Sequence, residues 1–112
     1  MARLDLYVNY SLQASIKLEG DRIELGRDPQ CEVQLADARV SRRHATIAAH
    51  QGAHTIENLG RNGTRVNGEP LTAPHRLRAG DAIFIASNIL IYQADGAPTE
   101  EALATQLDLP AD

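Results

Sequence analysis

Arginine, hydroxyl and turn-forming side chains recur between residues 26 and 68 of this 112-residue chain. They fall into four short groups: Gly26-Arg27, Ser41-Arg42-Arg43-His44, Asn62-Gly63-Thr64 and Val66-Asn67-Gly68. Guanidinium and hydroxyl groups donate hydrogen bonds, and asparagine and glycine adopt the backbone angles of tight turns. The groups contain no pair of carboxylates, cysteines or histidines at a catalytic or metal-ligand spacing. We therefore expect loops that bind an anion, with no catalytic role, no metal and no cofactor.

The composition indicates one globular domain. Hydrophobic residues make up 43% of the chain, which has no Trp, one Phe and three Tyr. A chain of this length buries a single core. Because aromatic residues are few, that core must be aliphatic, and a stacking platform for single-stranded nucleic acid is disfavoured. The net charge of −4 argues against a general affinity for nucleic acid or for an anionic membrane.

Cysteine usage and the first residues predict a cytoplasmic protein. Cys31 is the single cysteine of the sequence, so it forms no internal disulfide. The segment MARLDLYVNY lacks an apolar run of signal-peptide length. We expect Cys31 to be a small core or loop residue.

Charge is distributed unevenly along the chain. Residues 38–68 contain five arginines and one acidic residue, Glu57, whereas residues 96–112 contain four acidic residues and no basic one. Such a cluster is usually a solvated face. Here its spacing favours a basic binding region followed by an acidic tail.

Short apolar alternations separated by turn residues predict an all-β fold of about ten or eleven strands. The pattern is typical of a sandwich or barrel of antiparallel strands, and Asn67-Gly68 is a strong hairpin signal. We expect residues 1–95 to form the domain and residues 96–112 to form an acidic tail or linker. In that tail, Thr99 either caps a short helix or lies in a disordered segment.

The four groups, in this order and in an all-β chain of this length, resemble the forkhead-associated (FHA) domain over residues 4–94. The resemblance implies a sandwich of two antiparallel sheets with the binding loops at one end. It also implies a non-enzymatic module that binds phosphothreonine in a partner protein. A Ser/Thr kinase or a kinase substrate is the expected kind of partner. A phosphothreonine carries about −1.5 to −2 charges and three acceptor oxygens, which suit guanidinium and hydroxyl donors.

The resemblance also implies a role for each group. Phosphate would be bound by Arg27 and Ser41, with Arg42 as a further donor, and the peptide backbone would be bound by Asn62. His44 would brace the loop without touching the ligand. The remaining residues that shape loops are Gly26, Gly63, Thr64, Asn67 and Gly68.

Two arginines bear on specificity. The segment Asn58-Leu59-Gly60-Arg61-Asn62 is one residue shorter than the usual family pattern, and Arg61 stands where a Thr or Ser often helps to form the methyl-accepting pocket. A buried methyl group contributes only about 0.8 kcal/mol, so a small change in this loop can remove a preference for Thr over Ser. Arg61 would instead add a cation near the phosphate. Arg39 stands at a position that in some relatives faces the residue three places after the phosphothreonine, and charge complementarity predicts a preference for an acidic residue there.

Other interpretations remain open at this point. The main one is a phospho-independent scaffold or assembly domain that uses the same fold. His50 and His54 have the spacing of a helical zinc pair, but Gln51-Gly52-Ala53 predicts a hairpin turn between them. Ser41 with His44 lacks the other parts of a hydrolase site. A phosphorylated Thr105 in the tail, followed by Asp108, would be a candidate for docking on its own domain or on a neighbouring chain.

Overall fold

The computed structural model describes residues 2–94, and the predicted tail at residues 96–112, with Thr99 and Thr105, lies outside this part. The described residues contain eleven strands and no helix. Their bounds are β1 Arg3–Val8, β2 Ser11–Lys17, β3 Arg22–Gly26, β4 Val33–Gln34, β5 Ala45–His50, β6 Ala53–Asn58, β7 Arg65–Val66, β8 Glu69–Pro70, β9 His75–Arg76, β10 Ala82–Ile85 and β11 Asn88–Gln93. No segment of this part is a helix long and apolar enough to cross a membrane.

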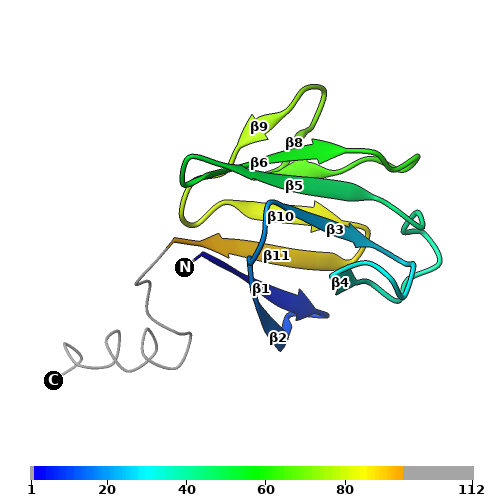
Figure 1. The fold of residues 1–112 in the computed structure, drawn as a ribbon. Helices are drawn as coiled ribbons and strands as arrows, with labels where there is room; N and C mark the ends of the chain where they lie inside the picture. The colour runs from blue at the N-terminus through cyan, green and yellow to red at the C-terminus, as the bar shows by residue number, and fades with distance from the viewer. Residues whose placement is uncertain (1, 95–112) are drawn as a thin grey trace, which may run out of the picture.

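The strands form two sheets (Figure 1). One has the order β2-β1-β11-β10-β7-β8 and the other β4-β3-β5-β6-β9. The predicted all-β sandwich is thereby confirmed. The pairing of β3 with β4 is parallel, with Leu25 opposite Val33, so the second sheet is mixed and not purely antiparallel.

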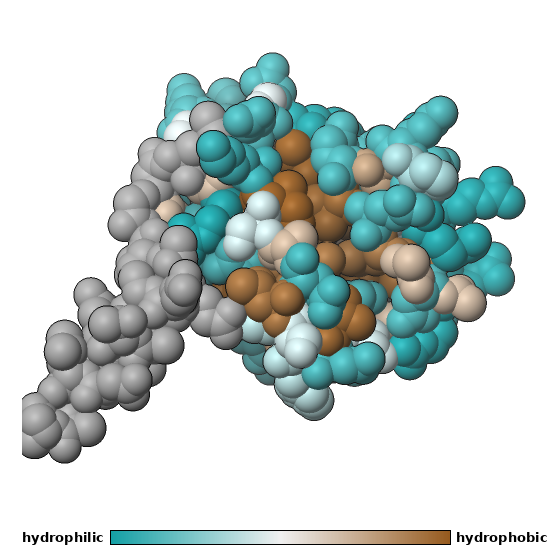
Figure 2. Space-filling model, turned by 90° about the horizontal axis from the view of Figure 1, so that it is seen from below, coloured by the Kyte–Doolittle hydropathy of each residue, from teal (hydrophilic) through white to brown (hydrophobic). Residues whose placement is uncertain are grey.

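The core lies between the sheets because alternate strand residues point inward. Leu4, Ile47, Ile56, Ile83 and Leu90 have no exposed surface. Burial of each such side chain stabilises the fold by about 1.5–3 kcal/mol. Figure 2, which views the molecule from the side where β2 and β4 lie in Figure 1, shows apolar residues gathered at the middle of that face.

Two of the hairpin turns have a residue with positive φ followed by glycine. Gln51 and Gly52 have φ values of 51° and 80°, and Asn67 and Gly68 have 54° and 87°, so both turns carry glycine at the second left-handed position. The segment between His50 and His54 is thus a hairpin and not a helix. The turn between β10 and β11 lies at Ala86-Ser87, and Asn88 opens β11 and is buried.

Candidate functional site

Strand register brings three loops to one end of the sandwich. Leu25, near the end of β3, pairs with Ala45 at the start of β5, and Ala45 also pairs with Asn58 at the end of β6. The segments at residues 27–32, 41–44 and 59–64 must therefore meet at this end, on the right in Figure 1. We call them the binding loops.

Gly26 allows the first two binding loops to touch. A Cβ atom on Gly26 would lie 2.1 Å from the carbonyl oxygen of Arg42, so only glycine fits. The backbone N–H of Arg27 donates to the Ser41 carbonyl at 3.0 Å, and that of Asp28 donates to the Arg42 carbonyl at 3.1 Å. Arg27 and Ser41, expected to act together, are thus adjacent.

His44 connects the second loop to the third. Its ring is fully buried, Nδ1 accepts the Ser41 N–H at 3.0 Å, and Nε2 lies 2.8 Å from the Gly63 carbonyl oxygen. Because an amide can only donate and a carbonyl can only accept, these partners select the neutral ring with its proton on Nε2. His44 therefore holds the loops from behind.

The third loop is closed by Asn58, to which sequence reasoning gave no role, together with the predicted loop residue Thr64. Asn58 Oδ1 accepts the Gly60 N–H at 3.1 Å and the Thr64 hydroxyl at 2.8 Å, while Asn58 Nδ2 donates to the Gly60 carbonyl at 3.1 Å. Thr64 is 1% exposed, so this network is internal. An asparagine two residues before a glycine is a recognisable turn signal, but its bond to Thr64 required the structure.

Ser41 keeps a free proton to donate. Its Oγ accepts the backbone N–H of Arg61 at 3.2 Å, and its own hydroxyl hydrogen has no acceptor among the described residues. A hydroxyl has one donor and two acceptor positions. The Arg61 amide therefore occupies an acceptor position and leaves the hydrogen available to a ligand.

Three guanidinium groups near Ser41 carry unneutralised charge. Arg27, Arg42 and Arg61 are exposed, and none forms an ion pair with a carboxylate of residues 2–94. The Arg27 Nε donates to the Val40 carbonyl at 3.0 Å, which orients the guanidinium and leaves its terminal nitrogens unused. By contrast, Arg43 lies 3.6 Å from Glu24. The binding loops thus present an anion site.

Arg39 is engaged by a carboxylate that the sequence analysis overlooked. Its guanidinium lies 2.9 Å from Asp37 and also donates to the Ser87 hydroxyl. The side-chain bond from Arg39, followed by the Arg39 backbone N–H, lowers the pKa of Asp37 to about 2. A partner residue must therefore compete with Asp37 for Arg39.

Asn62 lies on the exposed side of the third loop. Its Nδ2 donates to the Arg39 carbonyl at 2.8 Å. This bond leaves Oδ1, which has no donor among the described residues, as an acceptor toward solvent. An oxygen in this position suits the N–H of an extended peptide.

Asn67 and Gly68 do not join this cluster. Asn67 Nδ2 donates to Asp81 at 2.9 Å, and Asn67 Oδ1 accepts the Ala82 N–H at 2.9 Å, at the end of β10 away from the binding loops. The hairpin returns the chain to Thr64, whose carbonyl accepts the Leu71 N–H at 2.9 Å. Its connection with the site is therefore indirect.

The histidines considered for zinc lie outside the binding loops, and Cys31 is buried. Within residues 2–94, no three His, Cys, Asp or Glu side chains are grouped to hold a metal, and the His54 Nδ1 lies 2.7 Å from the Tyr92 hydroxyl. Cys31 is 7% exposed, and burial together with Glu24, Asp28 and Glu32 raises the pKa of its thiol.

Comparison with known proteins shows which family the sequence matches. The family model described as FHA domain matches residues 23–86. The chain is 38% identical over 73 residues to the Oxoglutarate dehydrogenase inhibitor of Corynebacterium glutamicum, and the match covers 64% of this chain and 50% of that protein. The chain therefore spans about half the length of this relative.

Solved structures share the fold. The FhaA FHA domain, complexed with the intracellular domain of Rv3910, has a TM-score of 0.75 and 26% identity over 83% of this chain and 100% of that chain. Mycobacterium tuberculosis EmbR, in complex with a low affinity phosphopeptide, has a TM-score of 0.77 and 26% identity over 87% of this chain and 26% of that chain.

Proposed function

Since the chain belongs to the FHA domain family, we propose that it binds phosphothreonine-containing segments of partner proteins through the binding loops. The family consists of binding modules, and we propose that this chain likewise binds without catalysing a reaction. A Ser/Thr kinase or its substrate is the partner class that fits, because such a partner carries the phosphate.

The free hydrogen of the Ser41 hydroxyl is the observation on which this proposal depends. Its oxygen already accepts the Arg61 N–H, so its hydrogen is free to donate to a phosphate oxygen. Arg27 supplies unused guanidinium nitrogens from the adjacent loop, and Arg42 supplies a second exposed guanidinium. Charge-assisted hydrogen bonds contribute roughly 1.5–3 kcal/mol each, so two or three suffice for reversible binding.

Asn62 and the two specificity arginines complete the proposal. The Asn62 Oδ1 would accept a backbone N–H of the bound segment, Arg61 would add positive charge near the phosphate, and Arg39 would attract an acidic side chain. Charge complementarity of this kind contributes more to specificity than to affinity. The shortened loop at Gly60 supports weak discrimination between phosphothreonine and phosphoserine.

The test is calorimetry with three peptides that differ only in carrying phosphothreonine, phosphoserine or unmodified threonine. The core sequence comes from a degenerate phosphothreonine library read position by position. We expect binding of the phosphorylated peptides alone. Arg27→Ala and Ser41→Ala should each weaken binding at least about tenfold, equivalent to about 1.4 kcal/mol, with little change in Tm.

Arg43→Ala is the matched control, since Arg43 is an exposed neighbouring arginine already paired with Glu24. It should bind the phosphopeptide like the unmodified chain. Equal affinity for the phosphorylated and unmodified peptides would reject phosphate recognition and favour the phospho-independent scaffold.

The 38% identity with the Oxoglutarate dehydrogenase inhibitor favours one second candidate, control of an oxoglutarate dehydrogenase. The assay adds this chain, alone or with a saturating phosphopeptide, to purified oxoglutarate dehydrogenase complex. Inhibition by the chain alone that the phosphopeptide relieves would indicate that the binding loops contact the enzyme.

A further inference from the structure

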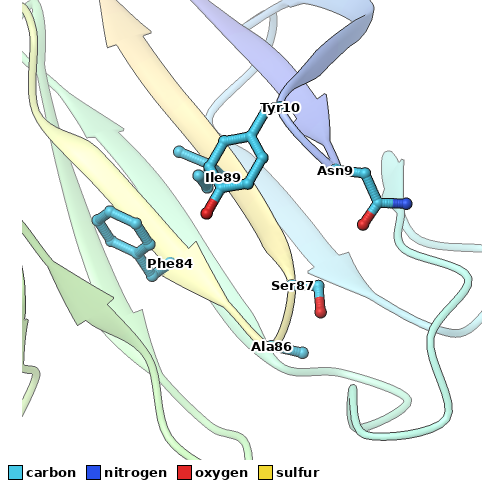
Figure 3. A pocket seen from close by; sticks show the side chains of 6 residues that line it. All are labelled: Asn9, Tyr10, Phe84, Ala86, Ser87 and Ile89. Atoms are coloured by element: carbon cyan, nitrogen blue, oxygen red, sulfur yellow. The ribbon is translucent and has the colours of Figure 1, made fainter.

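A hollow of about 240 Å³ lies on the outer face of the six-stranded sheet, at the end where the binding loops gather. It is lined by Asn9, Tyr10, Phe84, Ala86, Ser87 and Ile89. Figure 3 shows Tyr10, Phe84 and Ile89 on this face, with Asn9, Ala86 and Ser87 toward the turns. Phe84 and Ile89 point outward because their strand neighbours Ile83, Ile85 and Leu90 are fully buried.

Tyr10 has a left-handed backbone conformation, which is unusual for a tyrosine. Its φ is 65° and its side chain is 90% exposed, in a two-residue turn between β1 and β2. Bulky residues rarely adopt a left-handed backbone, and glycine is the usual second residue of such turns. The turns at Gly52 and Gly68 follow that rule. An exposed aromatic ring that strains its own turn indicates a binding role.

The turn between β10 and β11 also has a residue other than glycine in a left-handed conformation. Ala86 has a φ of 55° and also lines the hollow, so both non-glycine turns that border it carry backbone strain. Gln51 and Asn67 also have positive φ, but each precedes a glycine. Within the described residues, the two hairpin turns without glycine therefore meet at one hollow.

A neighbouring hollow includes residues of the third binding loop. A second hollow of about 290 Å³ is lined by residues 62–65, Pro70, Phe84 and Ala86. Phe84 and Ala86 line both hollows, so the two hollows are neighbours, with Asn62 lining one and Tyr10 the other. A peptide held at Asn62 would therefore lie next to this apolar surface.

We propose that Tyr10, Phe84 and Ile89 bind an apolar side chain of the same phosphorylated partner, at a fixed distance along the chain from its phosphothreonine. The proposal rests on the proposed function. A hollow of about 240 Å³ is smaller than the pockets of roughly 300–1,000 Å³ that enclose small ligands, so it suits one side chain. Exposed tyrosine supplies a rigid contact of large area, as in the residues that dominate protein interfaces.

The test uses phosphothreonine peptides with alanine at all flanking positions except one, where leucine is placed in turn. For the unmodified chain we expect leucine at one or two neighbouring positions, on one side of the phosphothreonine, to strengthen binding about fivefold to tenfold. Tyr10→Gly should abolish that gain while the all-alanine phosphopeptide binds as before. Because glycine relieves the turn, the same variant should have a higher Tm, whereas a purely structural tyrosine would lower it.

Gln51→Gly is the matched control, since it relieves a left-handed residue at the opposite end of the sandwich. It should leave the leucine gain unchanged. An equal leucine gain in Tyr10→Gly, or no leucine gain in the unmodified chain, would overturn the proposal while phosphate recognition stands. If the unmodified chain binds none of the phosphopeptides, the proposed function itself is rejected. If the chain sediments as a dimer that Tyr10→Gly converts to a monomer, the face is a self-association surface and the proposal is wrong.

Discussion

The imidazole ring of His44 lies against Gly60 so closely that a Cβ atom on Gly60 would be 2.5 Å from the ring. The ring cannot retreat, because it is fully buried and bonded to the Ser41 N–H and the Gly63 carbonyl. The shortened third loop thus depends on glycine at the point where it passes His44. This packing sets the position of the Arg61 N–H that bonds Ser41 Oγ.

Gly60→Ala should disrupt the site and lower stability. Overpacking of this kind costs about 1–3 kcal/mol, since the ring or the loop must shift. Displacing the loop should also weaken phosphopeptide binding. Urea unfolding and calorimetry measure the two effects.

Gly20→Ala is the control for Gly60→Ala. Gly20 has a φ of 87° and nothing within 4 Å of an added Cβ, so it reports backbone strain without a clash. It should leave peptide affinity unchanged. If both variants bind peptide equally well, His44 and Gly60 do not govern the site.

Asp37→Asn should strengthen the preference for an acidic residue after the phosphothreonine. The side chain that pairs with Arg39 would then be uncharged, and because exposed ion pairs are weak, a gain of only a few-fold is expected. The pKa of Asp37 is about 2, so the carboxylate stays charged at any pH suitable for binding, and mild acid does not replace the substitution. The measurement is the affinity ratio of peptides with Glu or Gln three places after the phosphothreonine.

Asp21→Asn changes net charge by the same amount at the opposite end of the sandwich, so it tests for a general electrostatic effect. Asp21 is exposed, and its carbonyl accepts the Ala49 N–H. If both variants change the ratio of affinities for the Glu and Gln peptides equally, the effect does not come from releasing Arg39 from Asp37.

Asp81 should make the fold sensitive to acid. Burial alone would raise its pKa, but bonds from His75, the Arg78 N–H and Asn67 outweigh burial and lower it. A carboxyl group whose pKa is lower in the folded state stabilises the fold above its unfolded pKa of about 3.9. That stabilisation is lost as pH falls through the folded pKa.

Asp81→Asn should therefore lower the free energy of unfolding near pH 7 by about 1–3 kcal/mol and flatten its decline below about pH 4. Urea unfolding across this range provides the measurement, and Asp21→Asn again serves as an exposed control. An unchanged acid slope in Asp81→Asn would contradict the assignment.

Cys31 should react slowly with iodoacetamide in the folded chain. Its thiol donates to the Arg42 carbonyl at 3.3 Å, and its raised pKa keeps it protonated near pH 8. The thiolate is the reactive form, so both accessibility and ionisation oppose alkylation. Mass spectrometry of the folded chain, the chain in urea and free N-acetylcysteine compares the rates. Equal rates in the folded and unfolded chain would show that Cys31 is open to solvent.

Residue type and local spacing were sufficient to predict the all-β fold class. Alternating apolar residues have the two-residue period of a strand, and Asn-Gly adopts two successive left-handed conformations, so strands and a hairpin turn can be predicted locally. The same local logic indicated loops that bind an anion, and the roles of Arg27 and Ser41 within them followed from the resemblance to the family. It could not identify the parallel pairing of β3 with β4, which depends on how a loop returns to the sheet.

The sequence by itself determined the all-β architecture and the chemical character of the binding loops, because both follow from neighbouring residues. Only the tertiary structure decided which groups are available to a ligand. It engages Arg39 with Asp37, leaves the Ser41 hydrogen free and sets Gly60 against His44. It also separates Asn67 from the site and places the hollow at Tyr10 beside the hollow at Asn62, with Phe84 lining both. These outcomes depend on strand register and packing between residues far apart in the chain, which spacing along the sequence does not encode.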